Sequence, residues 1–124
     1  MPHGFLAVPM LRSFDEARAK AFYLDFLGFT LDWEHRFEPG SPLYMQLSLE
    51  DMRLHLSEHH GDGCPGGAVF VQMRGLDDYH RAIMAKGYPN MRPGIEPAPW
   101  GGRLMTVIDP FGSRLNFWEP PQED

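Results

Sequence analysis

The chain has 124 residues and a net charge of −6, with 43% hydrophobic and 23% charged residues. These values are typical of one soluble globular domain, and the lack of a basic stripe argues against nucleic acid or an anionic membrane as partner. No apolar run approaches the roughly 20 residues that span a bilayer. A single cysteine, Cys64, cannot form an intramolecular disulfide. Without a signal-peptide pattern, this predicts a cytoplasmic protein.

The first half of the chain predicts a strand, a helix and three further strands. An apolar run over 5–11 contains Pro9, which should place the strand at a sheet edge or bend it. The segment Ser13–Glu16 has the pattern of a capping box with Ser13 as the N-cap. The helix should continue to about Leu27 and end at Gly28. Further strands are expected over 29–37, 43–49 and 53–57.

The second half repeats this order after a glycine-rich loop over 58–67. We expect a strand over 68–73, a helix over 76–86 that ends at Gly87, and a weak strand over 90–96. A hairpin over 104–118 should turn at Asp109-Pro110-Phe111-Gly112.

An internal duplication underlies this repeated order. The sequence Arg-Leu-His-Leu-Ser-Glu at 53–58 recurs as Arg-Leu-Asn-Phe-Trp-Glu at 114–119, an offset of 114 − 53 = 61 residues. The duplication predicts an α+β fold of two βαβββ modules, at about 5–58 and 68–119, within a single domain over 1–124.

Several short motifs connect this arrangement with a known family. They are Ala7–Leu11 in the first strand, Leu27-Gly28-Phe29 after the first helix, Arg74–Asp77 before the second, Pro99-Trp100-Gly101, and the turn at 109–112. With the two modules, they resemble the glyoxalase or vicinal-oxygen-chelate superfamily, and within it the bleomycin-resistance proteins. The resemblance implies a homodimer in which concave sheets close across two chains and the first strand is exchanged at Pro9.

Metal-dependent members of this superfamily bind one divalent ion through the first and last strands of each module. The resemblance places these positions at about Phe5, His55, Ala68 and Asn116. Phenylalanine and alanine cannot ligate, and a neutral asparagine replaces a carboxylate poorly. We therefore expect neither metal nor cofactor, which favours a non-catalytic protein over an enzyme. His3 is the nearest histidine that could supply the first position.

A second possible metal site is the group His55, Glu58, His59 and His60. Residues 55 and 59 would share a face if the strand continued. The alternative is that His59 and His60 are solvated loop residues. This alternative is favoured, because a glycine-rich continuation does not hold ligands rigidly.

Trp100 is the main candidate for ligand binding. It lies in a predicted loop beside Gly101 and Gly102, where a flat ring could stack on a planar ligand and the glycines would allow close approach. The alternative is a loop tryptophan that covers the edge of the core. Candidates for an opposing ring are Trp33 and Phe37.

The resemblance implies the same use of these rings, since bleomycin-binding proteins stack the drug's bithiazole between aromatic side chains. Bleomycin is cationic, so Asp32, which matches an aspartate of the family, would help to bind it, although a solvated surface carboxylate is the alternative. Three hypotheses follow: sequestration of bleomycin-type antibiotics, a metal-dependent glyoxalase-type lyase or isomerase, and a binder of another small planar ligand.

Overall fold

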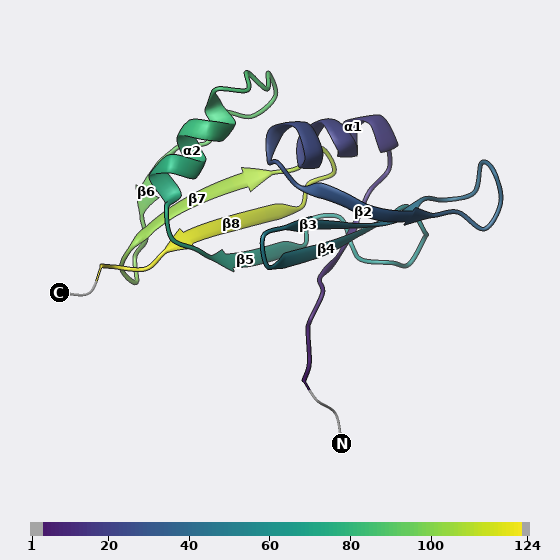
Figure 1. The fold of residues 1–124 in the computed structure, drawn as a ribbon, viewed down its shortest axis with the longest axis horizontal. Helices are drawn as coiled ribbons and strands as arrows, with labels where there is room; N and C mark the ends of the chain where they lie inside the picture. The colour runs from purple at the N-terminus through teal and green to yellow at the C-terminus, as the bar shows by residue number, and fades with distance from the viewer. Residues whose placement is uncertain (1–3, 123–124) are drawn as a thin grey trace.

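The computed structural model describes residues 4–122 and contains two four-stranded mixed sheets (Figure 1). The strand orders are β1-β4-β3-β2 and β5-β8-β7-β6, with the first pair of each sheet parallel and the others antiparallel. Equivalent strands thus occupy equivalent places in both sheets. This confirms the predicted α+β fold of two βαβββ modules.

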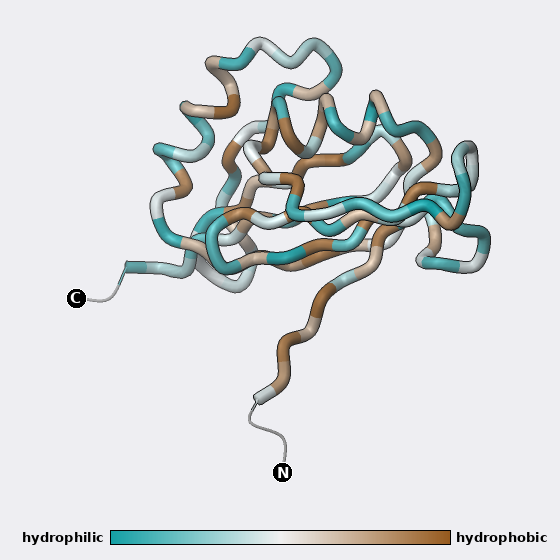
Figure 2. Tube along the Cα trace, turned by 45° about the vertical axis from the view of Figure 1, so that its right-hand side comes forward, coloured by the Kyte–Doolittle hydropathy of each residue, from teal (hydrophilic) through white to brown (hydrophobic). Residues whose placement is uncertain are grey.

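The first module consists of β1 (Met10–Arg12), α1 (Glu16–Lys20), the π-helical segment η1 (Ala21–Phe26), β2 (Thr30–His35), β3 (Tyr44–Leu49) and β4 (Met52–Ser57). Its first strand begins at Met10, not at position 5 as predicted. Residues 4–8 instead extend from the body as a hydrophobic arm, with Phe5 91% and Leu6 66% exposed (Figures 1 and 2), and the Pro9 carbonyl oxygen accepts the His55 backbone N–H at 2.9 Å. Hydrophobicity in 5–8 therefore does not mark a strand within this chain.

The start of the first helix also differs from the prediction. Ser13 is buried, and its backbone N–H bonds to the Ser57 carbonyl oxygen at 2.9 Å, so it prolongs the contact between β1 and β4. Asp15 is the N-cap instead, because its carboxylate accepts a bond from the Arg18 backbone N–H at 2.8 Å. The contact with a distant strand outweighs the local capping-box pattern.

The second module consists of β5 (Ala68–Gln72), α2 (Leu76–Met84), β6 (Ile95–Pro97), β7 (Arg103–Ile108) and β8 (Arg114–Glu119). The weak strand expected over 90–96 is confined to β6. The predicted turn at 109–112 is present, and the Asp109 carboxylate accepts bonds from the backbone N–H groups of Phe111 and Ser113. Asp109 also accepts the buried Tyr23 hydroxyl at 2.6 Å, which links the two modules.

The helices cover one face of both sheets and leave the other uncovered in this chain (Figure 1). A continuous core lies under the helices, and its strand residues alternate with side chains on the uncovered face: Met45, Leu47, Leu54 and Leu56 are buried in one sheet, and Met105, Val107, Leu115 and Phe117 in the other. Between residues 4 and 122, no helix has both the length and the apolar composition needed to cross a bilayer.

Candidate functional site

The uncovered side of the first sheet, here called the first open face, carries aromatic and polar side chains. Its members are Asp32, Trp33, Tyr44, Gln46, Ser48 and His55. The register between β2 and β3 shifts between Leu31 and Trp33. A bulge of this kind allows two successive residues to reach the same face. Asp32 and Trp33 therefore both belong to it.

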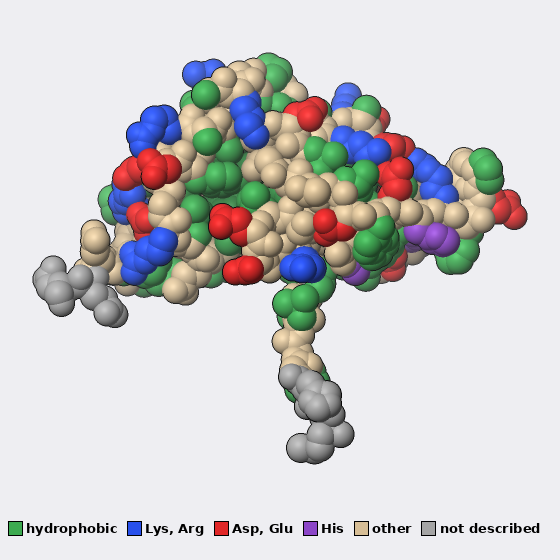
Figure 3. Space-filling model, in the orientation of Figure 1, with side chains coloured by type: hydrophobic (Ala, Val, Ile, Leu, Met, Phe, Trp, Pro, Cys, Tyr) green, Lys and Arg blue, Asp and Glu red, His purple; other side chains and the backbone are tan. Residues whose placement is uncertain are grey.

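Trp33 is the centre of a group of rings on this face. It stacks on Tyr44, with ring centroids 5.9 Å apart and an interplanar angle of 10°, and meets His55 edge-on at 5.4 Å. Phe37 lies beyond the end of β2, is 76% exposed and contacts the rings of His35 and His59. The space-filling view shows histidine beside hydrophobic side chains along this side of the molecule (Figure 3).

A continuous chain of side-chain hydrogen bonds crosses the three strands of the first open face. The Asp32 carboxylate accepts bonds from Gln46 at 3.0 Å and Ser48 at 2.8 Å. These bonds hold the pKa of Asp32 below its usual range, with a smaller contribution from Arg53. Asp32 is therefore an anionic acceptor at neutral pH.

The series of hydrogen bonds continues from Gln46 to His55, because the Gln46 side-chain oxygen lies 3.0 Å from His55 Nε2. It ends at Tyr44, whose hydroxyl lies 2.6 Å from His55 Nδ1. Sequence reasoning missed Tyr44 and Gln46. Their alternation with the buried Met45 and Leu47 could have placed them on this face.

The uncovered side of the second sheet, the second open face, carries the other tryptophans. Trp100 is 58% exposed, and its ring lies 6.3 Å from that of Phe70 and 6.4 Å from that of Trp118. Trp118 donates its Nε1–H to the Gly101 carbonyl oxygen at 2.8 Å. Gly102 has a φ of +76°, and an added Cβ would collide with the Glu119 carbonyl oxygen. The glycines therefore serve the tight packing of this loop on β8.

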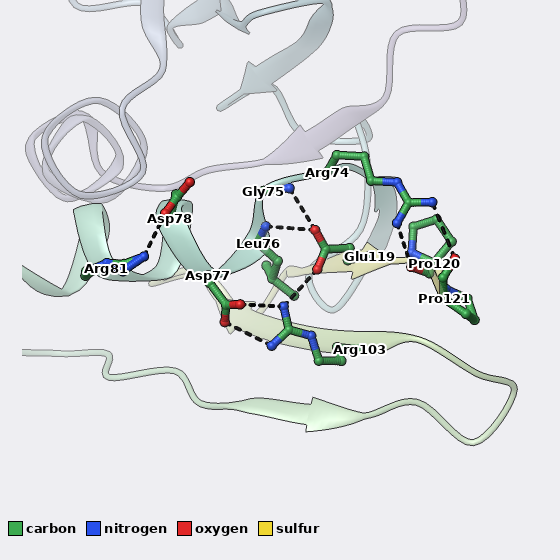
Figure 4. A network of polar contacts seen from close by, with 10 residues as sticks. All are labelled: Arg74, Gly75, Leu76, Asp77, Asp78, Arg81, Arg103, Glu119, Pro120 and Pro121. Carbon is green, nitrogen blue, oxygen red and sulfur yellow. Dashed lines mark hydrogen bonds and ion pairs between the residues drawn. The ribbon is translucent and has the colours of Figure 1, made fainter. Parts of the chain in front are cut away.

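A network of charged side chains lies at the start of β7, next to this loop in the sequence (Figure 4). Arg103, the first residue of β7, donates to Asp77 at 2.9 Å and to Glu119 at 2.8 Å. The other carboxylate oxygen of Glu119 accepts the backbone N–H groups of Gly75 and Leu76, and so caps α2. The network thus joins the start of β7, α2 and β8 beside the loop that carries Trp100.

The rings proposed to oppose each other lie on separate sheets. The ring contacts of Trp33 are with Tyr44 and His55, whereas those of Trp100 are with Phe70 and Trp118. Each ring thus packs within its own module. The structure of one chain does not bring Trp33 or Phe37 against Trp100.

The structure shows which residues lie beside the two predicted ligand positions His55 and Asn116. The parallel register pairs His55 with Met10 and Asn116 with Phe70, so neither Phe5 nor Ala68 lies directly opposite them. Phe5 lies in the arm, and Ala68 pairs with Arg114.

These four paired residues do not fit a divalent cation either. A phenylalanine offers no donor atom, and a thioether is a weak ligand for hard cations. Both ring nitrogens of His55 have hydrogen-bond partners, and the side-chain oxygen of Asn116 accepts the Thr106 hydroxyl at 2.7 Å.

The second possible metal site is the group His55, Glu58, His59 and His60. His55 and His59 both lie beside the Tyr44 ring, at 5.1 and 6.4 Å, although β4 ends at Ser57. His60 is exposed in the loop, as is Cys64. Over residues 4–122, no three His, Cys, Asp or Glu side chains form a group that could hold a metal ion. His3 lies outside the described residues.

Comparison with known proteins agrees with this architecture. The chain is 25% identical to a bleomycin resistance protein of Geobacillus stearothermophilus, over 91% of this chain and 95% of that protein. A crystal structure of a bleomycin-binding protein in complex with bleomycin has the same identity, covers 97% of this chain and 100% of its own, and gives a TM-score of 0.71.

A bleomycin resistance determinant encoded on the transposon Tn5 is 22% identical, with a TM-score of 0.72 over 96% of this chain and all of that one, and shows the same fold. The profile of the family described as "Glyoxalase superfamily protein" matches residues 4–124. Fold, internal duplication and this match agree, and the chain belongs to the glyoxalase superfamily.

Proposed function

We propose that this protein binds and sequesters a cationic, partly planar antibiotic of the bleomycin type without catalysing a reaction. The observation that carries the proposal is the exposed Trp100 ring, which the Gly101-Gly102 loop holds beside Phe70 and Trp118. Aromatic surface of this kind favours a flat ligand. Sequestration requires affinity and shape only, and the donor set at the superfamily's metal positions offers no Lewis-acid chemistry.

The proposed binding cleft requires two chains. Trp33 and Asp32 lie on the first open face and Trp100 on the second, so the two aromatic walls would meet when the first open face of one chain covers the second open face of another. Phe70 is 53% and Ile108 39% exposed in a single chain. Their burial would favour association, since apolar contact contributes about 25 cal/mol per Å².

The hydrophobic arm is the second argument for a homodimer. Phe5 and Leu6 are largely exposed in the single chain, and an exchange at Pro9 would allow them to pack on a partner. The acidic character of the protein, with a net charge of −6, suits a cationic ligand. Named relatives that confer bleomycin resistance or bind bleomycin support this ligand class.

The test is calorimetric titration of the metal-free protein with metal-free bleomycin. We expect saturable binding at one ligand per chain, or two per dimer. The absence of heat, together with saturable binding of a different planar cation, would favour a binder of another ligand. A glyoxalase-type activity that appears on addition of zinc, nickel, manganese or iron would favour the enzyme.

A further inference from the structure

The hydrogen bonds of the first open face have a definite direction. A carboxylate only accepts, so Asp32 must receive the N–H of Gln46 and the hydroxyl proton of Ser48. This fixes the orientation of the Gln46 amide, because its nitrogen faces Asp32 and its oxygen faces His55. The donor that completes the 3.0 Å contact is therefore the His55 Nε2–H.

The other ring nitrogen of His55 must then accept. Desolvation lowers the pKa of His55, which keeps the imidazole neutral at neutral pH with one proton, on Nε2. Burial and, second, the charge of Asp62 raise the pKa of Tyr44, so its hydroxyl also keeps its proton. Nδ1 accepts this proton across 2.6 Å.

The result is a surface with more free acceptors than donors. Three donors already have partners: the Tyr44 hydroxyl bonds to His55, the Ser48 hydroxyl to Asp32, and the imidazole N–H to Gln46. Lone pairs remain free on the oxygens of Tyr44, Ser48 and Asp32. The second amide N–H of Gln46 is the one donor left over among these five side chains. These acceptors lie beside the ring of Trp33, which is 43% exposed.

We propose that Tyr44 is a specificity-determining residue for N–H-rich cationic ligands, and that His55 is its positioning residue because it accepts the hydrogen bond of the Tyr44 hydroxyl and so leaves the oxygen lone pairs to face the ligand. The inference rests on the proposed function. It assigns to the first open face the recognition of ammonium, guanidinium or amide N–H groups beside a planar ring, and it predicts discrimination against anionic ligands.

A double-mutant cycle tests the proposal with metal-free bleomycin as the probe. Tyr44→Phe removes the acceptor and keeps the ring, whereas His55→Leu keeps the oxygen but frees its proton to turn toward the ligand. Since a hydrogen bond to a charged group is worth about 1.5–3 kcal/mol, Tyr44→Phe should weaken binding about 10- to 150-fold, and His55→Leu should weaken it less. The double variant should lose little more than Tyr44→Phe alone, because His55 acts through the Tyr44 hydroxyl. His60→Leu, an exposed histidine in the neighbouring loop, is the matched control and should leave affinity unchanged.

A spectroscopic measurement on the free protein separates this role from a merely structural one. Long-range ¹H–¹⁵N correlation of the His55 imidazole should show the neutral tautomer with its proton on Nε2, and Tyr44→Phe should shift the Nδ1 resonance. Bleomycin binding that is unchanged in Tyr44→Phe, losses that add in the double variant, or a proton on Nδ1 would each overturn the inference and leave the proposed function standing. Absence of binding by the unmutated protein would instead reject both.

Discussion

The exposure of Trp100 leads to the sharpest prediction, for the substitution Trp100→Ala. The side chain is 58% exposed, so about two fifths of a surface of up to about 250 Å² is buried. At about 25 cal/mol per Å² this is an upper bound of about 2.5 kcal/mol. Because alanine keeps part of the contact, we expect the free energy of unfolding to fall by about 1–2 kcal/mol, which is well below the about 3–5 kcal/mol of a core tryptophan.

The same substitution should also weaken bleomycin binding. Loss of an aromatic stack typically costs about 1–3 kcal/mol, which is a rise in Kd of roughly 5- to 150-fold. The melting temperature should fall by only about 4–8 °C, since 1 kcal/mol corresponds to about 4 °C for a domain of this length. Calorimetric titration and thermal unfolding of one preparation give both quantities.

Phe14→Ala is the matched control. Phe14 is 56% exposed, close to the exposure of Trp100, but it precedes α1 and packs edge-on against Phe111 at 6.0 Å, outside both open faces. It should lower the melting temperature to a similar degree with affinity unchanged. If Trp100→Ala causes a large loss of stability while the folded fraction binds bleomycin normally, Trp100 does not belong to the site.

The metal, the oligomer and the charged network give three more predictions. Elemental analysis after dialysis should find no stoichiometric divalent metal, and about one equivalent per chain would contradict the assignment of the donor set. Sedimentation equilibrium at micromolar concentration should give a dimer of the 14.2 kDa chain, and removal of residues 1–8 should weaken it; a monomeric intact protein would refute the two-chain cleft. Glu119→Gln should lower stability by about 1 kcal/mol, as for other lost caps. Hydrogen bonds from Arg103 and then Leu76 lower the pKa of Glu119 in the folded state. The stability that ionised Glu119 contributes is therefore fully present above pH 4.5, and it is lost as the pH falls through the pKa of the folded state. The difference between Glu119→Gln and the unmutated protein should therefore shrink in acid.

The fold could be predicted from the sequence alone because short local patterns reveal the internal duplication. Repetition of 53–58 at 114–119 and the glycines after each helix predicted two βαβββ modules. Gly28 and Gly87 do have positive φ values, of 88° and 70°, which is a local requirement that residue type reveals. Trp100 was similarly visible, because a tryptophan between a proline and two glycines does not belong to a periodic strand.

Tertiary structure decided which residues face one another. The register of β1 against β4 places Met10, and not Phe5, beside His55, and the register shift in β2 brings both Asp32 and Trp33 to one face. Such offsets arise from contacts between strands far apart in the sequence. A displacement of one residue reverses the faces without changing the local pattern. The chain of bonds from Asp32 to Tyr44 depends on these registers across three strands, and for that physical reason only the folded chain reveals it.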